Sequence, residues 1–600
     1  MAGTTNIRLH WVRSLDEAME LKRWLGERRP NNWLGVDTES GGLDWWRDRL
    51  RTVQFGDRHD GWCIEWNEWA GLIKECIEAY DGPQALWNVK HDLHFMEHNG
   101  IKVKRWLCHD GRAMAHLQNP WSRTGLKPTA TRMLGPWANY GEQELKHAMM
   151  AGGWGWDDVP IEVEWEYAAF DTVITAQTVE ELYPGIAAGF ASIYDLELAS
   201  TFVLTDMERR GILTDRDWMV RNADEWQQNA DRIAVSLREF QIGNPASDKQ
   251  VIAALQQHLG WQPIVFTEKG NISLEREVLQ GIGHPIADLV LEYRTNTKLQ
   301  QYVTQHLELA GPDGRLHCSI NPLGARTGRE SASRPNLQNL PRDDTRIRNG
   351  FVAGEGNLLL FPDYDQIEGR LFAHYAGDQR MLESIRYGDH MTNQGYDGYD
   401  LHSMAARIVF GIGANDAVPK KLRNQTKNIQ FGKIYGSGLE KFMAMTGLSR
   451  EDAQDRIAKY EAEFPETRKN GGFGSRVTQR LYERERAEGE GYVMTAYGRK
   501  EPCYPSQGYK ALNYLIQGTA ADVLKSKKVA LSKTWMGEHM LLSVHDEIIF
   551  EIPELALPEA VRTIRQTMPE TEKFAVPLTV GIAAGRRWGQ KEEIPLSYAA

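Results

Sequence analysis

The sequence predicts an α/β and α+β multidomain protein, and three observations lead to this fold class. The chain has 600 residues, more than one hydrophobic core organises, so roughly two to four domains are expected. Residues 1–185 alternate short apolar strands with helical stretches, residues 190–310 are mostly helical, and from about residue 311 strands and long helices are mixed. The composition, 41% hydrophobic and 25% charged, is that of an ordinary globular protein.

No stretch of the sequence has the pattern of a signal peptide or the ~20 apolar residues of a membrane span, so an intracellular protein is expected. The five cysteines form no C-x-x-C pair, so we expect reduced thiols and neither a disulfide framework nor a zinc site. The net charge of −12 by itself disfavours a nucleic-acid partner. Local charge differs, however, because residues 326–348 hold six arginines against three acidic residues.

Two acidic side chains are flanked by apolar residues in LLSVHDEIIFEI, residues 541–552. Burying an unpaired carboxylate costs several kcal/mol, so Asp546 and Glu547 either lie in an exposed hairpin turn or are compensated by a cation. We interpret the stretch as two short strands that meet at a tight turn.

A second acidic stretch, LFPDYDQIEGR, follows an expected strand over residues 358–361 and leads into a helix. Asp365 and Glu368 fit a D-x-x-E capping box at the start of that helix, which does not explain Asp363. The turn after residue 544 would let Asp546 face Asp363, although 183 residues separate them. A pair of Mg²⁺ ions that bridges the two carboxylates would supply the missing compensation.

A separate group of acidic residues lies in the first 171 residues. Asp37 and Glu39 are two residues apart at the end of an apolar strand, so both side chains point the same way. Taken alone, a solvated strand-end turn explains them. Asp92 follows in NVKHD, and Tyr167 and Asp171 share one helix face at i,i+4 spacing, which alone could be coincidence.

RNQTKNIQFGKIYGSG contains a stripe of two cations and two aromatic residues. Arg423, Lys427, Phe431 and Tyr435 recur every four residues, and on a helix they extend over about 18 Å. A nucleoside triphosphate matches this stripe, because its phosphates need cations and its base needs a ring to stack on. A partly buried amphipathic helix with snorkelling cations is the alternative.

Taken in order, the D-x-E, N-x-x-x-D and Y-x-x-x-D patterns resemble the three motifs of 3′-to-5′ proofreading exonucleases with an RNase H-like fold. The resemblance implies that four carboxylates hold two divalent metal ions and that Tyr167 positions the attacking water. The metal ligands would be Asp37, Glu39, Asp92 and Asp171.

Nearly the whole chain resembles the family A DNA polymerases, the group of bacterial DNA polymerase I (Klenow-like) and its phage relatives. DYDQIEGR resembles the family's motif A, RNQTKNIQFGKIYG its motif B and VHDE its motif C. TGRESASRPNLQNLPR at 327–342 resembles another family signature, and MERRGILTD and LEYRTNTKLQQYV resemble its thumb.

The resemblance implies an RNase H-like exonuclease domain followed by a right-hand polymerase domain. The expected boundaries are 1–190 for the exonuclease domain and 191–600 for the polymerase domain, with the thumb at about 191–310, the palm at about 311–370 and 505–600, and the fingers at about 371–504.

The family also implies roles for single residues at the polymerase site. Asp363, Asp546 and the backbone carbonyl of Tyr364 would hold two Mg²⁺ ions, with Mn²⁺ as a substitute, and Glu547 would support the site from its edge. Arg423 and Lys427 would bind the triphosphate, with His402 and Gln366 nearby. Phe431 would contact the sugar and base, Tyr435 would lie where the template base is admitted, and Glu368 would exclude ribonucleotides. The residues implied to contact DNA are Arg329, Asn513, Gln517, His545 and Arg499.

Several features depart from the bacterial pattern. Asp365 replaces a usual serine, Gln430 replaces a common asparagine, and the segment 386–402 is longer. The chain starts directly at the exonuclease motifs, so we expect a bacteriophage replicative enzyme that works as a monomer in the cytoplasm of its host. Its expected partners are primer–template DNA, dNTPs and replisome proteins such as a helicase/primase or a single-strand binding protein. Residues 195–310 are too short for a thioredoxin-binding insertion, and no membrane partner is expected.

Three other functions stay open on the sequence alone. A single-subunit RNA polymerase shares the two-aspartate palm, although Glu368 and the exonuclease motifs count against it. A non-catalytic DNA-binding scaffold would have lost carboxylates that this chain retains. An exonuclease with a vestigial polymerase would be insensitive to Asp363→Asn in every activity.

Overall fold

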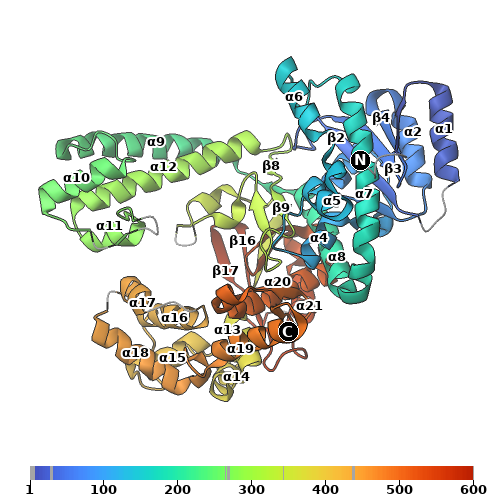
Figure 1. Cartoon of the computed structure of the whole chain (residues 1–600). Coiled ribbons are helices and arrows are strands. Elements are labelled where there is room, and N and C mark those ends of the chain that lie inside the picture. Colours follow the sequence, from blue (N-terminus) through green and yellow to red (C-terminus); the bar gives the residue numbers. More distant parts are fainter. Residues whose placement is uncertain are drawn as a thin grey trace.

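The computed structural model describes residues 7–27, 32–263, 265–266, 270–341, 344–435, 439–446 and 448–598. Arg342, Asp343 and Gly436, which belong to segments discussed above, lie outside these ranges. Figure 1 shows four parts: an N-terminal lobe, a central sheet, an elongated helical arm, and a helical lobe below the arm. The arm and the helical lobe both extend from the central sheet.

A six-stranded sheet forms the centre of the N-terminal lobe. Its strand order is β1-β4-β3-β2-β5-β6, with antiparallel pairing from β2 through β3 to β4 and parallel pairing elsewhere. The strands are β1 Arg8–Val12, β2 Leu34–Ser40, β3 Leu50–Gly56, β4 Asp60–Glu65, β5 Gln84–Leu86 and β6 Cys108–Asp110.

Alternation along β2 assigns its side chains to the two faces of this sheet. Val36 faces a core that α1, α2 and α3 cover, whereas Asp37 and Glu39 face the long helix α7. Helices α4, α5 and α6 pack against α7. The helices are α1 Leu15–Gly26, α2 Trp66–Ala79, α3 Val89–His98, α4 Gly111–Gln118, α5 Leu126–Leu134, α6 Glu142–Gly152 and α7 Ile161–Gly189.

Two glycines allow α7 to lie unusually close to the strands. A Cβ atom on Gly35 would be 2.1 Å from the carbonyl oxygen of Thr172, and one on Gly61 would be 2.3 Å from that of Ala169. Real Cβ atoms do not approach backbone oxygens so closely, so only glycine is compatible with this spacing.

Helix α8 (Ala191–Arg210) follows α7 after a sharp bend and contacts both the N-terminal lobe and the central sheet region. It packs against α3 and α4 on one side and against α20 and β14 on the other. The predicted thumb began at residue 191, but α8 lies at this junction and not in the arm. No single helix among the described residues is long and apolar enough to cross a membrane; α7 and α8 meet that test only as a pair, bent by 117°.

The arm consists of α9 and α12, which pack along one another, with a small core at its tip. Leu237, Ile242, Val251, Leu255 and Ile286 belong to this tip core. The helices are α9 Arg216–Leu237, α10 Asp248–Leu259, α11 Arg276–Ile282 and α12 Pro285–Leu309.

The central sheet is antiparallel throughout, with the order β14-β15-β11-β16-β17. Helices α13, α20 and α21 share its hydrophobic core. The bounds are β11 Asn357–Tyr364, α13 Ile367–Ala376, α20 Ala511–Ser532, β14 Met540–Val544, β15 Glu547–Pro553, α21 Leu557–Thr567, β16 Val580–Arg587 and β17 Gln590–Glu593. Three two-stranded pairs add β7 Ile212–Leu213 with β8 Arg315–Leu316, β9 Ser319–Asn321 with β10 Ser331–Ser333, and β12 Tyr492–Met494 with β13 Lys500–Pro502.

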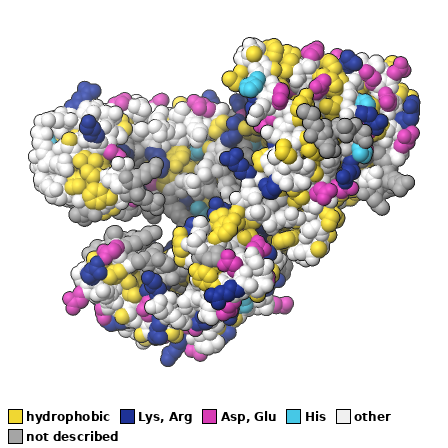
Figure 2. All heavy atoms as spheres, in the orientation of Figure 1, with side chains coloured by type: hydrophobic (Ala, Val, Ile, Leu, Met, Phe, Trp, Pro, Cys, Tyr) yellow, Lys and Arg dark blue, Asp and Glu magenta, His cyan; other side chains and the backbone are white. Residues whose placement is uncertain are grey.

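The remaining helices form the second lobe, and the surface is hollowed between this lobe and the arm (Figure 2). Asp378 and Asp400 cap two of its helices by accepting backbone N–H groups of the first turn. The helices are α14 Gln379–Asn393, α15 Leu401–Phe410, α16 Lys420–Ile434, α17 Leu439–Thr446, α18 Arg450–Glu463 and α19 Phe473–Glu488.

A buried ion network joins α8 to α20. Glu197 on α8 accepts hydrogen bonds from the Lys525 ammonium at 2.7 and 2.8 Å and from the guanidinium of Arg499. Arg499 also binds Asp522 at 2.6 and 2.8 Å and is only 1% exposed. The predicted DNA contact of Arg499 is therefore wrong, because its guanidinium lies inside the protein.

We expect Glu197→Gln to lower stability markedly, because it leaves two buried cations with less compensation. Breaking a buried ion pair by removing one partner costs about 3–5 kcal/mol, which corresponds to a Tm lower by at least about 5 °C. Differential scanning calorimetry measures this change. Asp195→Asn, on an exposed position of the same helix, is the matched control and should leave the Tm unchanged; equal effects of the two variants would contradict the importance of the network.

Candidate active sites: two carboxylate clusters

The β14–β15 hairpin and the end of β11 bring Asp363, Asp546 and Glu547 together. Asp363 lies opposite Glu547 in the antiparallel register, so these two side chains share a face of the sheet. Asp546 lies in the two-residue turn before Glu547, and its carbonyl oxygen accepts from the backbone N–H of Tyr364 at 3.4 Å. His545, the other turn residue, has a positive φ of 58°, which tight hairpin turns require.

Crowding of negative charge is the main electrostatic property of this corner. Desolvation raises the pKa of Asp363 to about 7, with further contributions from the carboxylates of Glu547 and Asp546. A cation between these groups would stabilise their ionised forms.

Lys591 also belongs to this corner, although no sequence pattern predicts it. It belongs to the edge strand β17, forms an ion pair with Glu547, and lies 4.8 Å over the ring of Phe361. Its ammonium partly offsets the raised pKa of Asp363. A lone lysine in a short polar strand carries no sequence signal of such a position.

The predicted capping box at Asp365 and Glu368 is wrong. Helix α13 starts after Gln366, which has a positive φ of 51° and makes no side-chain cap. The Asp365 carboxylate instead accepts from the Thr579 hydroxyl at 2.8 Å. Glu368 points elsewhere, so neither carboxylate serves the helix terminus.

Glu368 connects two other predicted site residues. Its carboxylate binds the Arg329 guanidinium at 2.5 Å and accepts from the hydroxyl of Tyr435. Gln517 on α20 also hydrogen-bonds Tyr435. These four side chains therefore form one polar group between α13, α16, α20 and the loop at residue 329.

Arg423, Lys427 and Phe431 of the predicted stripe lie on α16, and Tyr435 directly follows the last residue of this helix. The rings of Phe431 and Tyr435 stack with centroids 6.0 Å apart, and the Lys427 ammonium is 5.8 Å from the Phe431 ring. Arg423, one turn before Lys427, forms an ion pair with Asp400 at 3.0 Å. All four stripe residues keep part of their surface exposed.

His402 lies behind this stripe and not on it. It is 3% exposed, and its ring centroid is 6.2 Å from that of Phe431. Burial lowers the pKa of His402 to about 4. In this structure His402 is thus a neutral, buried neighbour of the stripe, and its predicted place near the triphosphate stays a prediction.

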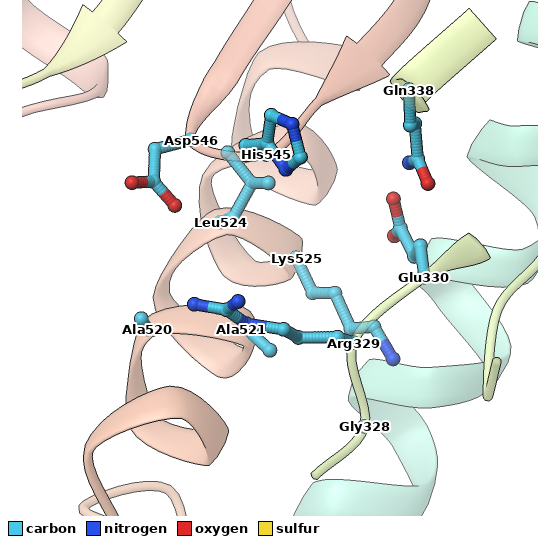
Figure 3. A pocket seen from close by; sticks show the side chains of 10 residues that line it. All are labelled: Gly328, Arg329, Glu330, Gln338, Ala520, Ala521, Leu524, Lys525, His545 and Asp546. Atoms are coloured by element: carbon cyan, nitrogen blue, oxygen red, sulfur yellow. The ribbon is translucent and has the colours of Figure 1, made fainter. Parts of the chain in front are cut away.

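A pocket next to Asp546 is lined by residues from four segments: the loop at 328–330, the short 3-10 helix Leu337–Asn339, α20 and the β14–β15 turn (Figure 3). Asp546 and His545 lie at the hairpin turn, while the Arg329 side chain extends along Ala520 and Ala521 of α20. Asn513 and Gln517 precede Ala521 at four-residue spacing on α20 and therefore share its face. Of the residues predicted to contact DNA, Arg329 and His545 line this pocket, whereas Gln517 and Asn513 lie one and two turns before Ala521 on α20.

The first group of acidic residues also converges, between β2, α3 and α7. Asp37 and Glu39 face α7, which presents Tyr167 and Asp171 on consecutive turns, and Tyr167 hydrogen-bonds Asp171. Asp92 on α3 accepts from the Thr38 hydroxyl at 2.8 Å.

Burial shapes the acidity of this cluster. Desolvation raises the pKa of Asp37 and Glu39 well above the usual range, and the neighbouring carboxylates raise them further. Desolvation likewise raises the pKa of Asp92 to about 7. These carboxyl groups cannot all ionise at low cost in free energy unless cations bind between them.

Three further charged residues complete this cluster, although no sequence pattern predicts them. Glu164, fully buried one turn before Tyr167, forms an ion pair with Arg51 at 2.9 Å. Lys127 on α5 forms an ion pair with Asp171. Desolvation raises the pKa of Glu164 to about 7, whereas Arg51 opposes this shift.

The donor sets of both clusters fit divalent cations such as Mg²⁺, which prefer carboxylate and carbonyl oxygens. Oδ2 of Asp92 is buried without a hydrogen-bond partner, so it is available as a ligand. Throughout the described ranges, however, no three His, Cys, Asp or Glu side chains converge as a ready-made metal site. At Asp171 the position of a cation is taken by the Lys127 ammonium.

Comparisons with known proteins identify both halves of the chain. A family model described as DNA polymerase family A matches residues 216–590, and one described as 3′-5′ exonuclease matches residues 10–187. The chain is similar to DNA polymerase I of Chloroflexus aurantiacus, with 30% identity over 86% of this chain and 55% of that protein. It is also similar to the DNA polymerase of Mycobacterium phage D29, with 28% identity over 94% of each chain.

The chain spans about half the length of the bacterial relatives that it matches, and almost all of the phage relative. Among solved structures, it resembles the POL domain of Pol1 from M. smegmatis in complex with DNA primer–template and dNTP. The TM-score is 0.78 at 25% identity, and the match covers 97% of this chain and 99% of that one.

The pKa of Asp363 predicts a pH-dependent effect of Asp363→Asn on the metal-free protein. Between about pH 4 and pH 7, folded Asp363 retains a proton that the unfolded chain has lost, so stability falls as the pH rises. In EDTA at pH 8, the variant should melt about 2–4 °C higher than the parent, and the gain should vanish toward pH 4. Asp397→Asn, at an exposed position, is the control; a gain that is independent of pH would contradict the assignment.

Proposed function

The chain belongs to DNA polymerase family A, and on that premise we propose that it extends a DNA primer along a template strand with dNTPs and removes mispaired 3′ nucleotides. The single observation that carries the proposal is the meeting of Asp363 and Asp546, 183 residues apart in sequence, at one corner of the central sheet. The second carboxylate cluster, in a different lobe, supports a separate hydrolytic centre.

Asp363, Asp546 and the Tyr364 carbonyl are proposed to hold the cations of the polymerase centre. Asp37, Glu39, Asp92 and Asp171 are proposed to hold those of the exonuclease centre. When bound, two divalent cations at each centre would supply Lewis acidity, which lowers the pKa of the attacking hydroxyl or water and stabilises charge on the phosphate.

The α16 stripe is proposed to bind the incoming dNTP. Arg423 and Lys427 provide charge for the triphosphate, and Arg423 would exchange its carboxylate partner Asp400 for a phosphate oxygen. Phe431 offers its ring to the sugar and base, and phenylalanine in place of tyrosine would favour discrimination against dideoxynucleotides.

Glu368 is proposed to exclude ribonucleotides by occupying the space of a 2′-hydroxyl. Its bonds to Arg329 and Tyr435 hold the carboxylate in one orientation, so it cannot easily move aside. Tyr435, in turn, is positioned to guard the entry of the template base. Gln366, at the start of α13, is proposed to lie near the triphosphate.

The pocket beside Asp546 is proposed to receive the end of the primer duplex. Arg329, Asn513, Gln517 and His545 can donate to the acceptors of the minor groove, which all base pairs share. Such contacts would test the shape of the last base pair without selecting a sequence.

At the exonuclease centre, Tyr167 is proposed to orient the attacking water. Its hydroxyl already hydrogen-bonds Asp171, and burial raises its pKa, so it stays protonated and can donate.

The near full-length match to the phage D29 polymerase supports a role in phage genome replication. We propose that the chain acts there as a monomer, alongside a helicase/primase or a single-strand binding protein. Glu368 and the second carboxylate cluster favour this function over a ribonucleotide polymerase.

Asp363→Asn should reduce primer extension by about 10³-fold or more, while degradation of a single strand continues. A labelled primer–template, incubated with Mg²⁺ and with or without dNTPs, reports both activities at once. Asp37→Asn should have the opposite effect. Asp365→Asn, two residues from Asp363 but bound to Thr579, is the matched control and should retain most of the extension activity. Full extension by Asp363→Asn would refute the proposed polymerase centre.

Glu368→Ala should raise the use of rNTPs relative to dNTPs by about 10- to 100-fold, because space opens beside the sugar. Single-nucleotide insertion kinetics with paired dNTP and rNTP substrates measure this ratio. Glu368→Gln keeps the side-chain volume and should keep the discrimination. If the two variants discriminate alike, volume at this position does not set the sugar specificity.

A further inference from the structure

Lys127 is a buried lysine whose ammonium lies among the carboxylates of the proposed exonuclease centre. It belongs to the first turn of α5 and is 6% exposed. Its ammonium forms an ion pair with Asp171 and donates to the backbone carbonyl of Tyr140 at 3.3 Å. It also lies 4.8 Å from the ring of Tyr167 and 5.0 Å from that of Phe170.

The position of Lys127 matters because the cluster contains more negative than positive groups. Five acidic side chains meet there, and they are Asp37, Glu39, Asp92, Glu164 and Asp171. Arg51, the other cation, is bound to Glu164 and to the carbonyl oxygens of Trp156 and Val159. Lys127 is therefore the cation that directly faces Asp171.

We propose that Lys127 is a resident counter-cation of the exonuclease centre: it holds Asp171 and Tyr167 in place in the metal-free enzyme, and its ammonium leaves Asp171 when a divalent cation binds. This inference rests on the proposed function of the cluster. Lys127 is a positioning residue in this account, because it acts on the substrate through Asp171 and Tyr167.

The two contacts of the ammonium explain how one side chain orders both residues. The ion pair fixes the Asp171 carboxylate, and attraction to the ring face favours one position of Tyr167, four residues earlier on the same helix. Tyr167 hydrogen-bonds Asp171, so the three groups form a closed arrangement. A divalent cation at Asp171 would replace the charge of the ammonium, while the bond to the Tyr140 carbonyl gives Lys127 a partner that remains.

The polymerase centre contains a comparable arrangement. Lys591 forms an ion pair with Glu547, and its ammonium lies over the ring of Phe361. In both centres a lysine from a neighbouring element thus pairs with an acidic residue of the cluster and contacts an aromatic face. The recurrence supports charge compensation, since a lysine that only packs would not need a carboxylate of the cluster.

A competing cation weakens metal binding, so its removal should strengthen it. We expect Lys127→Met, which keeps an unbranched side chain of similar length without the charge, to tighten Mn²⁺ binding at the exonuclease centre about tenfold. The same variant should lower the Tm in EDTA and enlarge the increase in Tm on adding Mn²⁺. Exonuclease activity should reach half its maximum at a lower metal concentration.

The measurement uses the full chain with Asp546→Asn, so that binding at the polymerase centre is weakened. Mn²⁺ is titrated at pH 8.5, where the acidic groups with a pKa near 7 are ionised, and free Mn²⁺ is followed by electron paramagnetic resonance. Lys127→Arg keeps the charge and should bind Mn²⁺ like the parent. Lys22→Met, an exposed lysine on α1 that pairs with Glu75, is the control for loss of a lysine.

Unchanged or weaker Mn²⁺ binding by folded Lys127→Met would overturn the proposal and leave Lys127 as a packing residue. If that variant does not fold in EDTA, Lys127→Gln gives the same test with a neutral donor at the position. Asp37→Asn separates this outcome from failure of the proposed function. If Asp37→Asn retains full Mn²⁺ binding and nuclease activity, the exonuclease assignment itself is wrong, and the role of Lys127 falls with it.

Discussion

Both candidate active sites depend on one constraint: carboxylates that the backbone forces together and removes from water must be balanced by positive charge. At the central sheet, the antiparallel register brings Asp363 opposite Glu547, and the hairpin turn adds Asp546. In the N-terminal lobe, β2, α3 and α7 converge on a second set. Lysine and arginine side chains of the protein balance part of this negative charge. The negative charge that remains unbalanced makes each cluster suited to divalent cations.

Much of this could be predicted from the sequence because the decisive residues interrupt apolar runs. Asp546 and Asp363 are recognisable because an apolar run precedes each of them, and a charge beside buried residues needs compensation. The prediction for Arg499 is wrong because the sequence of a polar loop does not distinguish an arginine exposed to solvent from one that binds a buried Asp522. The predicted capping box is wrong because Gln366 adopts a left-handed backbone conformation, which no sequence pattern predicts. No local sequence pattern predicts the positions of Lys127, Lys591 and Glu164, because they join the clusters only when elements distant in sequence pack together.

Helix α8 carries the contacts through which the N-terminal lobe and the central sheet region adjoin. Glu197 binds Lys525 of α20, and Glu208, three turns later, binds Lys90 and His94 of α3 as well as the backbone of Ile320. Buried ion pairs are costly to separate, so these contacts favour a fixed relation between the lobes. Passage of DNA between the two carboxylate clusters would then require motion of the DNA strand and not rearrangement of α8.

The absence of side chains at Gly35 and Gly61 has a consequence for the geometry of hydrolysis. These glycines let α7 rest on the strands, and α7 carries Tyr167 and Asp171 while β2 carries Asp37. The spacing between β2 and α7, which carry these acidic residues, thus depends on two glycines that contribute no side chain to the cluster. A side chain at Gly35 or Gly61 would therefore alter the spacing of the acidic cluster without any change in the acidic residues themselves.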